Sequence, residues 1–145
     1  MILAHPIVGV ILGSYFGYFW YWVAGSVVPD VDHLYVMARN KIFTSEKIID
    51  SIRFEEKYNL KYKTRFIHSL LGAVVVSLPV FIFNYKGGLC FFAGYAIHLL
   101  LDWLDIDEKY YLFPFQKKFS GFLPIFSVTE IIFTIVLFLV MLESF

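Results

Sequence analysis

Two short stretches of this sequence combine histidine with aspartate at spacings that suit metal chemistry. The stretch Asp30-Val31-Asp32-His33 offers three oxygen or nitrogen donors within four residues, enough to chelate one ion or to bridge two. His98 and Asp102 are four residues apart, so on a helix they share one face and can bind one ion or orient each other. Imidazole and carboxylate ligands without a thiolate suit Zn²⁺, Mn²⁺ or Fe²⁺ better than a structural cysteine-type site.

The elements that must position these residues are four apolar runs. Hydrophobic residues make up 59% of the 145 residues, and the mean hydropathy is +0.71, against about 45–50% apolar residues in soluble domains. The runs cover residues 6–28, 67–85, 89–101 and 122–142. A membrane-spanning helix needs about 20 apolar residues, so the sequence predicts an all-α integral membrane bundle with about four spans, forming one domain over 1–145. The third run is long enough only if it includes His98 and Asp102.

The segments between the runs predict smaller elements. Residues 84–88 contain asparagine, lysine and two glycines, which indicates a compact polar turn. Residues 45–58 contain three isoleucines among charged residues. This pattern predicts either a helix lying in the plane of the membrane interface or a solvated helical loop. Residues 105–121 predict an ordered loop near the lipid headgroups. No basic region or cleavage site follows Met1, so the N-terminus is expected to be retained.

The loop charges predict the orientation of the bundle. Of the 12 lysines and arginines, all but Lys86 lie on the side of the membrane where the first run ends, which the positive-inside rule assigns to the cytoplasm. Residues 30–33 follow the first run on that side, His68 begins the second run there, and His98 and Asp102 end the third run there. Three separate segments therefore deliver imidazoles and carboxylates to one face of a plasma or inner membrane.

This convergence predicts a metal centre with one or two ions, most simply Zn²⁺. Two ions would suit phosphoester hydrolysis, where metals activate water and neutralise developing charge. Asp32 and Asp102 are the candidates to accept the proton. The same residues also fit two other functions for this chain. It could be a metal-binding or metal-transport protein, or a membrane scaffold whose polar cluster holds the helices together. The net charge of +0 offers no argument for nucleic acid, and the expected partners are membrane lipids.

The same residues, in the same order, resemble a family signature. The stretch 25–33 resembles the PDxDH signature of the LexA-regulated, membrane-bound, metal-dependent hydrolases, the YdjM-like family. Residues 65–69 resemble its HRGxTHS motif, His98 to Asp102 its HxxxD motif, residues 113–115 the PF that follows, and Ala4-His5 its N-terminal TH. The matches span nearly the whole chain. The resemblance implies an integral membrane protein with a hydrolase-like metal site whose ligands are Asp30, Asp32, His33, His68, His98, Asp102 and His5.

The resemblance has further implications and some departures. The HxxxD motif is similar to that of zinc-dependent phospholipase C enzymes, which implies phosphoester or lipid substrates. The first histidine of the second motif is missing, and Lys63 or Thr64 occupies that neighbourhood. The motif's glycine and threonine are replaced by Phe66 and Ile67. Asp105 and Asp107 stand where the family has a threonine-rich stretch.

Three residues have two interpretations each. A straight helix over 6–28 puts His5 roughly 35 Å from Asp30, whereas a re-entrant hairpin, which the glycines of this run permit, brings His5 into the site. Glu130 is either a further ligand or base, or part of the helix-starting capping box Ser127-Val128-Thr129-Glu130. Arg65 either binds a phosphate or anionic headgroup of the substrate or anchors the chain at the interface.

Overall fold

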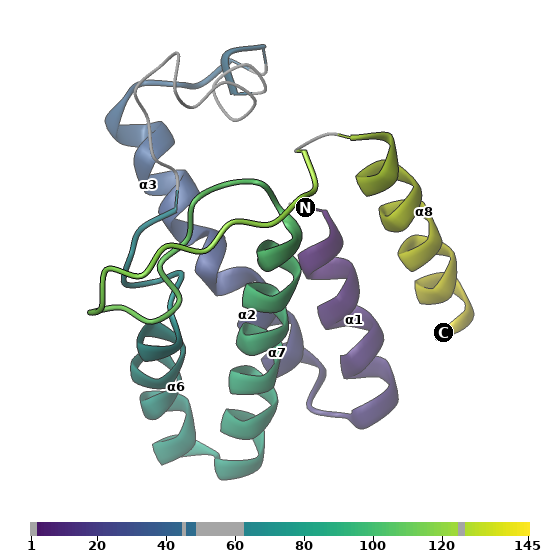
Figure 1. The fold of residues 1–145 in the computed structure, drawn as a ribbon. Coiled ribbons are helices and arrows are strands. Elements are labelled where there is room, and N and C mark those ends of the chain that lie inside the picture. Colours follow the sequence, from purple (N-terminus) through teal and green to yellow (C-terminus); the bar gives the residue numbers. More distant parts are fainter. Residues whose placement is uncertain (1–2, 45, 49–62, 125–126) are drawn as a thin grey trace.

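The computed structural model describes residues 3–44, 46–48, 63–124 and 127–145, and this part of the chain is all-helical (Figure 1). The all-α expectation is therefore confirmed for the described residues. In chain order the elements are α1 Ala4–Phe16, α2 Phe19–Val27, the 3-10 turn η1 Val28–Asp30, α3 Val31–Arg39, α6 Leu70–Phe83, α7 Tyr85–Leu104 and α8 Val128–Glu143.

The first apolar run folds as a hairpin of α1 and α2, so the straight-helix alternative is wrong. The chain reverses at Gly17 and Tyr18, whose φ angles are 71° and 54°. With ψ at −172°, Gly17 occupies a backbone region that only glycine adopts without strain. The reversal brings the start of α1 back to the end of α2 (Figure 1), and this places His5 beside Asp30.

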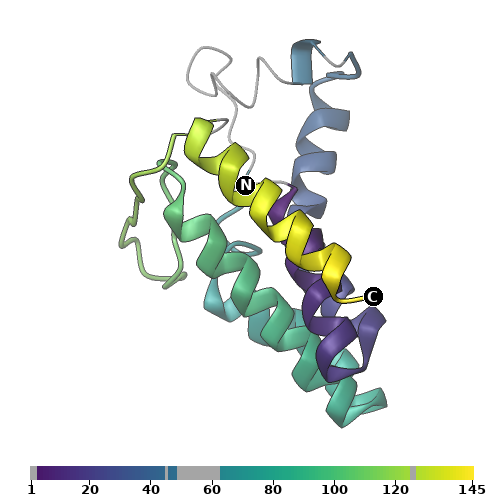
Figure 2. The same ribbon diagram turned by 90° about the vertical axis from the view of Figure 1, so that its right-hand side faces the viewer.

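Close backbone contact between α2 and α7 joins the hairpin to the rest of the bundle. A Cβ added at Gly25 would lie 2.1 Å from the Phe91 carbonyl oxygen, and one at Gly94 would lie 2.7 Å from the Trp22 carbonyl oxygen. Side chains are excluded at this crossing. Helix α7 also packs on α6, and α8 packs on α1 (Figure 2).

The turn between α6 and α7 is tighter than expected. Only Asn84 lies outside the two helices, and its side-chain oxygen accepts a hydrogen bond from the Gly87 N–H at 3.0 Å. This cap lets α7 begin at Tyr85, so Lys86 and both glycines are helical and the turn is confined to Asn84 instead of extending over 84–88. Helix α7 gains length and carries His98 and Asp102 in its last two turns.

Pro29 lies at a change of helix direction between α2 and α3, and helical structure continues after it. It lies within the 3-10 turn η1, and α3 follows at once. A proline early in a helical turn loses no hydrogen bond, because the first N–H groups have no partner within the helix. The predicted element over 45–58 lies mostly outside the described residues, of which 46–48 are helical. Residues 105–121 form the expected loop, in which Lys109 and Phe119 exchange backbone hydrogen bonds of 2.8 and 2.9 Å.

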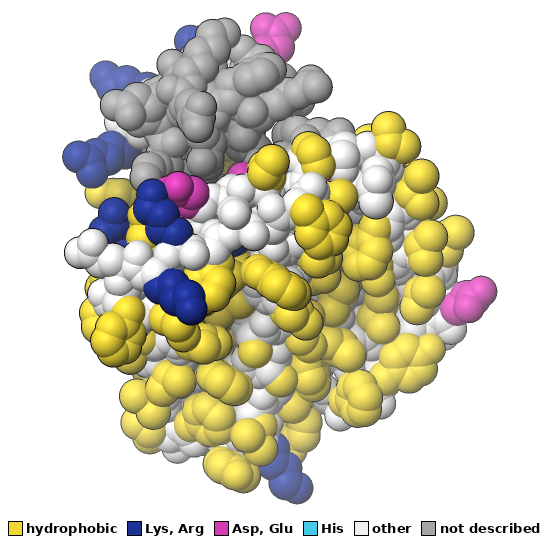
Figure 3. Space-filling model, in the orientation of Figure 1, with side chains coloured by type: hydrophobic (Ala, Val, Ile, Leu, Met, Phe, Trp, Pro, Cys, Tyr) yellow, Lys and Arg dark blue, Asp and Glu magenta, His cyan; other side chains and the backbone are white. Residues whose placement is uncertain are grey.

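Among the described residues, one helix is long and apolar enough to cross a membrane. This is α7, with 20 residues, while α1 and α6 are shorter apolar helices. Helix α8 has 16 residues. The length and composition of the helices therefore establish one span of the expected four. Large apolar side chains are nevertheless exposed along α6 and α8, and hydrophobic surface covers most of the face in Figure 3, with lysines and arginines gathered mainly near the loop end.

Candidate metal centre

Residues from five segments meet at the loop end of the bundle. They come from α1, η1, α3, the turn before α6, and α7: His5, Asp30, Asp32, His33, His68, His98 and Asp102. All seven were predicted as ligands from the sequence, and the structure brings all of them together. Five have exposed fractions of 0–2%: His5, Asp32, His68, His98 and Asp102. Burial of so many ionisable groups is costly unless they are paired or hold a metal.

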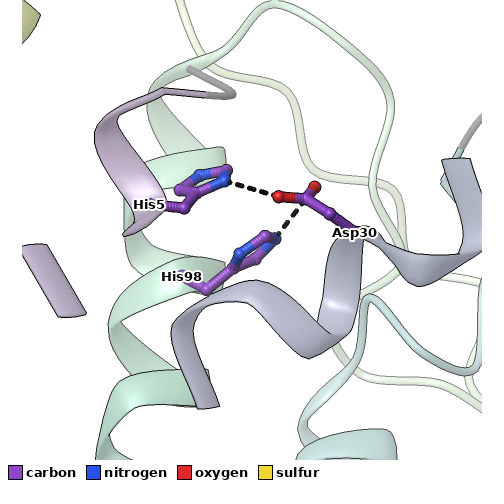
Figure 4. Close-up of side chains that lie close together, drawn as sticks. All are labelled: His5, Asp30 and His98. Atoms are coloured by element: carbon purple, nitrogen blue, oxygen red, sulfur yellow. Dashed lines mark hydrogen bonds and ion pairs between the residues drawn. The ribbon is translucent and has the colours of Figure 1, made fainter. Parts of the chain in front are cut away.

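His5, Asp30 and His98 form one side of the cluster and point toward one another (Figure 4). The Nδ1 atom of His5 lies 3.1 Å from Asp30 Oδ2, and His98 Nε2 lies 3.8 Å from Asp30 Oδ1. The centroids of the two imidazole rings are 3.7 Å apart. This contact depends on the hairpin of α1 and α2, because His5 belongs to the first turn of α1 and Asp30 follows α2.

A backbone carbonyl fixes the tautomer of His98. Its Nδ1 lies 2.8 Å from the carbonyl oxygen of Ser26, which can only accept, so Nδ1 carries the proton. In the neutral form of the ring, the lone pair of Nε2 then faces Asp102 Oδ2, 3.6 Å away. A histidine anchored through one nitrogen with the other left bare is the usual arrangement of a metal ligand.

A carboxylate orients His68 in the same way. Its Nδ1 lies 3.0 Å from Asp32 Oδ2, which also accepts a hydrogen bond from the Thr64 N–H at 2.7 Å. The Nε2 atom of His68 then faces Asp102 Oδ2 at 3.4 Å. The turn that holds His68 ends at Ser69, whose hydroxyl oxygen caps α6 by accepting from the Gly72 N–H.

Asp102 lies at the centre of these contacts. The Nε2 atoms of His5, His68 and His98 are each within 3.4–3.6 Å of one of its oxygens. These three nitrogens and Asp102 Oδ2 are buried without a hydrogen-bond partner among the described residues. Unsatisfied buried polar atoms are rare and need an explanation, and a cation that accepts their lone pairs would supply one.

The donor atoms fall into three overlapping groups, in each of which the donors lie within 4.8 Å of one another. They are His5, Asp30 and His98; then Asp30, His33 and His68; then His68, His98 and Asp102. His33 Nδ1 also lies 3.1 Å from Asp32 Oδ1. Asp32 belongs to none of the three groups, because its two oxygens face His68, Thr64 and His33.

The model of the YdjM inner membrane protein family matches residues 3–144. The chain belongs to the YdjM inner membrane protein family. This membership makes it a membrane protein, in accord with the apolar surface and with α7 as a span. No curated protein and no solved structure is similar enough to be matched to the chain.

A lysine of this YdjM-family chain also enters the cluster, and the sequence did not single it out as a site residue. Lys63 Nζ lies 3.0 Å from Asp102 Oδ1, 3.0 Å from Asp107 Oδ2 and 3.6 Å from Asp105 Oδ2. The signal available in the sequence was the departure from the family motif, whose first histidine is missing where Lys63 and Thr64 stand. Two further aspartates soon after Asp102 were the second signal.

The electrostatics of the loop residues follow from these contacts. Burial opposes the negative charge of Asp32, but the hydrogen bonds from His33 and His68 hold the pKa of this carboxyl below its usual value. Burial lowers the pKa of His68, which favours the neutral ring that a metal requires. Burial also opposes the charge of Lys63, but Asp102, Asp107 and Asp105 together raise its pKa.

Two of the remaining candidates lie differently from the cluster residues. Arg65 is exposed, and its guanidinium lies over the Tyr110 ring at 4.4 Å from the centroid. Glu130 is buried at the start of α8, where its backbone N–H donates to the Ser127 hydroxyl at 3.2 Å, which is the N-cap half of the expected capping box. The Ser127 N–H donates to the Pro124 carbonyl. Glu130 belongs to none of the three donor groups found among the described residues.

Proposed function

We propose that this chain is a membrane-bound, metal-dependent hydrolase that acts on an ester or phosphoester at the cytoplasmic face of the membrane. The observation that carries the proposal is the set of three buried, partnerless histidine Nε2 atoms around Asp102. Imidazole and carboxylate donors without a cysteine favour Zn²⁺, with Mn²⁺ or Fe²⁺ as alternatives.

The ligands that the geometry favours are His5, His68, His98 and Asp102, with Asp30 and His33 at the more exposed edge. When bound, a divalent cation polarises an ester or phosphoryl oxygen and makes water nucleophilic near neutral pH. Asp32 and the Ser26 carbonyl hold two of the imidazoles in the orientation required. The carboxyl of Asp30 is 19% exposed, whereas those of Asp32 and Asp102, the candidates from the sequence, are 2% and 1% exposed, so we assign the acceptance of the proton to Asp30.

The membrane topology belongs to the same proposal. Helices α6, α7 and α8 cross the bilayer, and the hairpin of α1 and α2 enters it and returns. The loop end with the cluster then faces the cytoplasm, as the lysine and arginine distribution indicates. A lipid headgroup or another phosphoester at this level can reach the edge formed by Asp30 and His33, and the exposed Arg65 is available to an anionic group.

The interior of the bundle favours a surface-facing site over metal transport. The Ser77 hydroxyl donates to the Ala73 carbonyl within α6, and the Thr134 hydroxyl donates to the Glu130 carbonyl within α8. These two hydroxyls are therefore used inside their own helices. On this ground we favour a surface-facing site over transport.

The deciding experiment measures hydrolysis by the purified full-length chain. The protein in detergent is loaded with Zn²⁺ or Mn²⁺ and offered a nitrophenyl ester, a bis-nitrophenyl phosphate and a short-chain phospholipid. We expect turnover of at least one substrate, lost on chelation and restored by metal, and lowered roughly 100-fold in Asp102→Asn through loss of a ligand. Cys90→Ala is the matched control on α7. A chain that binds metal but hydrolyses none of these substrates would contradict the hydrolase.

A second prediction separates the ligands from the residues that orient them. Asp32→Asn removes the charge that orients His68 while leaving every donor in the three groups, so we expect metal affinity to fall by about 10–100-fold with unchanged stoichiometry. Competition with a fluorescent chelator measures the affinity. Glu108→Gln, which alters an exposed carboxylate paired with Lys118, is expected to change nothing. Complete loss of the ion in Asp32→Asn would instead make Asp32 a ligand.

A further inference from the structure

The two oxygens of Asp102 face different groups. Oδ2 faces the bare Nε2 atoms of His68 and His98 at 3.4 and 3.6 Å. Oδ1 lies 3.0 Å from the ammonium of Lys63, with His5 Nε2 at 3.5 Å. A carboxylate that links two neighbouring cations is typical of two-metal hydrolytic centres, in which the ions lie about 3.5–4 Å apart.

The surroundings of the Lys63 ammonium are those of a cation site built from oxygen. Carboxylate oxygens of Asp102, Asp105 and Asp107 lie within 3.0–3.6 Å of its nitrogen, and the lysine side chain is only 12% exposed. Hard divalent cations such as Mn²⁺ prefer oxygen donors of this kind. The three carboxylates follow one another closely in sequence, at the end of α7 and the start of the next loop.

A second lysine keeps these carboxylates in place without competing for them. The Lys109 ammonium is buried and donates to the backbone carbonyls of Asp105 and Asp107, the latter at 3.1 Å. The loop after α7 is thus tied to Lys109 through its backbone, and the side chains of Asp105 and Asp107 remain directed at Lys63. Removing Lys63 would therefore leave oxygens of Asp102 and Asp107, each 3.0 Å from its nitrogen, facing one another.

We propose that Lys63 takes the place of a second metal ion: the centre holds one divalent cation, and the Lys63 ammonium, bound by Asp102, Asp105 and Asp107, supplies the second positive charge beside it. This inference rests on the metal centre of the proposed function. According to this inference, the side chain of Lys63 determines how many metal ions the chain binds. An uncharged residue at position 63 is therefore predicted to open a second metal site.

The test counts Mn²⁺ ions bound by the full-length chain in detergent, using equilibrium dialysis and metal analysis. We expect one ion per chain in the wild type and two in Lys63→Gln and Lys63→Met. We expect one ion in Lys63→Arg, which keeps the charge, and one in Lys118→Gln, which removes an exposed lysine. The double variant Lys63→Gln with Asp107→Asn is expected to return to one ion, because the new site loses a carboxylate.

The outcomes distinguish this inference from the proposed function. One ion in both uncharged variants, or two in the wild type, overturns the role of Lys63 but leaves the metal centre intact. No ion in the wild type overturns the metal centre itself, and the inference falls with it. If Lys63→Met does not fold, Lys63→Gln carries the test, because its amide can still donate to the carboxylates.

Discussion

Replacing His98 by alanine is expected to lower the metal content of the purified chain from about one ion to none. His98 belongs to two of the three donor groups, and its Nε2 faces both Asp30 and Asp102. Its Nδ1 proton is fixed by the Ser26 carbonyl, so no other tautomer competes for the metal-facing position. Removing this ring takes away the donor that joins the His5 side of the cluster to the His68 side.

The His98 result is measured by metal analysis after purification without chelator. Cys90→Ala is the matched control, because Cys90 lies on the same helix about 12 Å along the axis from His98. Circular dichroism of both variants verifies that the helices are retained. Normal metal content in His98→Ala would show that the ion, if present, is held elsewhere, and the proposed centre would have to be abandoned.

Replacing Gly25 by valine is expected to produce the largest loss of stability of any single substitution in α2. A Cβ at this position would lie 2.1 Å from the carbonyl oxygen of Phe91 and 3.0 Å from its Cα. These are backbone atoms of α7, so no side-chain rotation relieves the clash and the two helices must separate. Overpacking of this kind costs about 1–3 kcal/mol, and more where the backbone must move.

The same substitution should weaken metal binding at a distance. Separation of α2 from α7 moves the Ser26 carbonyl away from His98 Nδ1, and the imidazole loses its anchor. Thermal unfolding in detergent measures the stability, and chelator competition measures the affinity. Val27→Ala, at a partly exposed position of α2, is expected to change both much less. An unaltered melting temperature in Gly25→Val would contradict the close packing of these helices.

Apart from His5, the residues of the centre could be predicted from local features of the sequence. His98 and Asp102 share a helix face through their spacing, and the sequence placed residues 30–33, His68, His98 and Asp102 at one end of the bundle by counting apolar runs. Hydropathy alone locates the ends of membrane helices, because burying a polar group in hydrocarbon costs free energy and polar residues therefore lie near the membrane boundary. The convergence therefore needed no knowledge of contacts.

Two features of the centre could not be derived in this way. The position of His5 depends on the reversal at Gly17 and Tyr18, and apolar composition does not distinguish a hairpin from a straight helix. The role of Lys63 depends on where the segment before α6 crosses the end of α7. A lysine in a charged loop is usually solvated, and only its contacts with Asp102 and Asp107 reveal that it is enclosed.

The sequence by itself determined that the chain is helical and membrane-embedded and that its histidines and aspartates gather at one end, because helix period, apolar length and loop charge are local properties. The tertiary structure decided that Nε2 is the nitrogen without a hydrogen bond in His5, His68 and His98, that Asp32 orients while Asp102 is central, and that a lysine shares the cluster. These depend on distances between segments far apart in the chain, such as Ser26 with His98 and Thr64 with Asp32, which packing sets and sequence spacing does not encode.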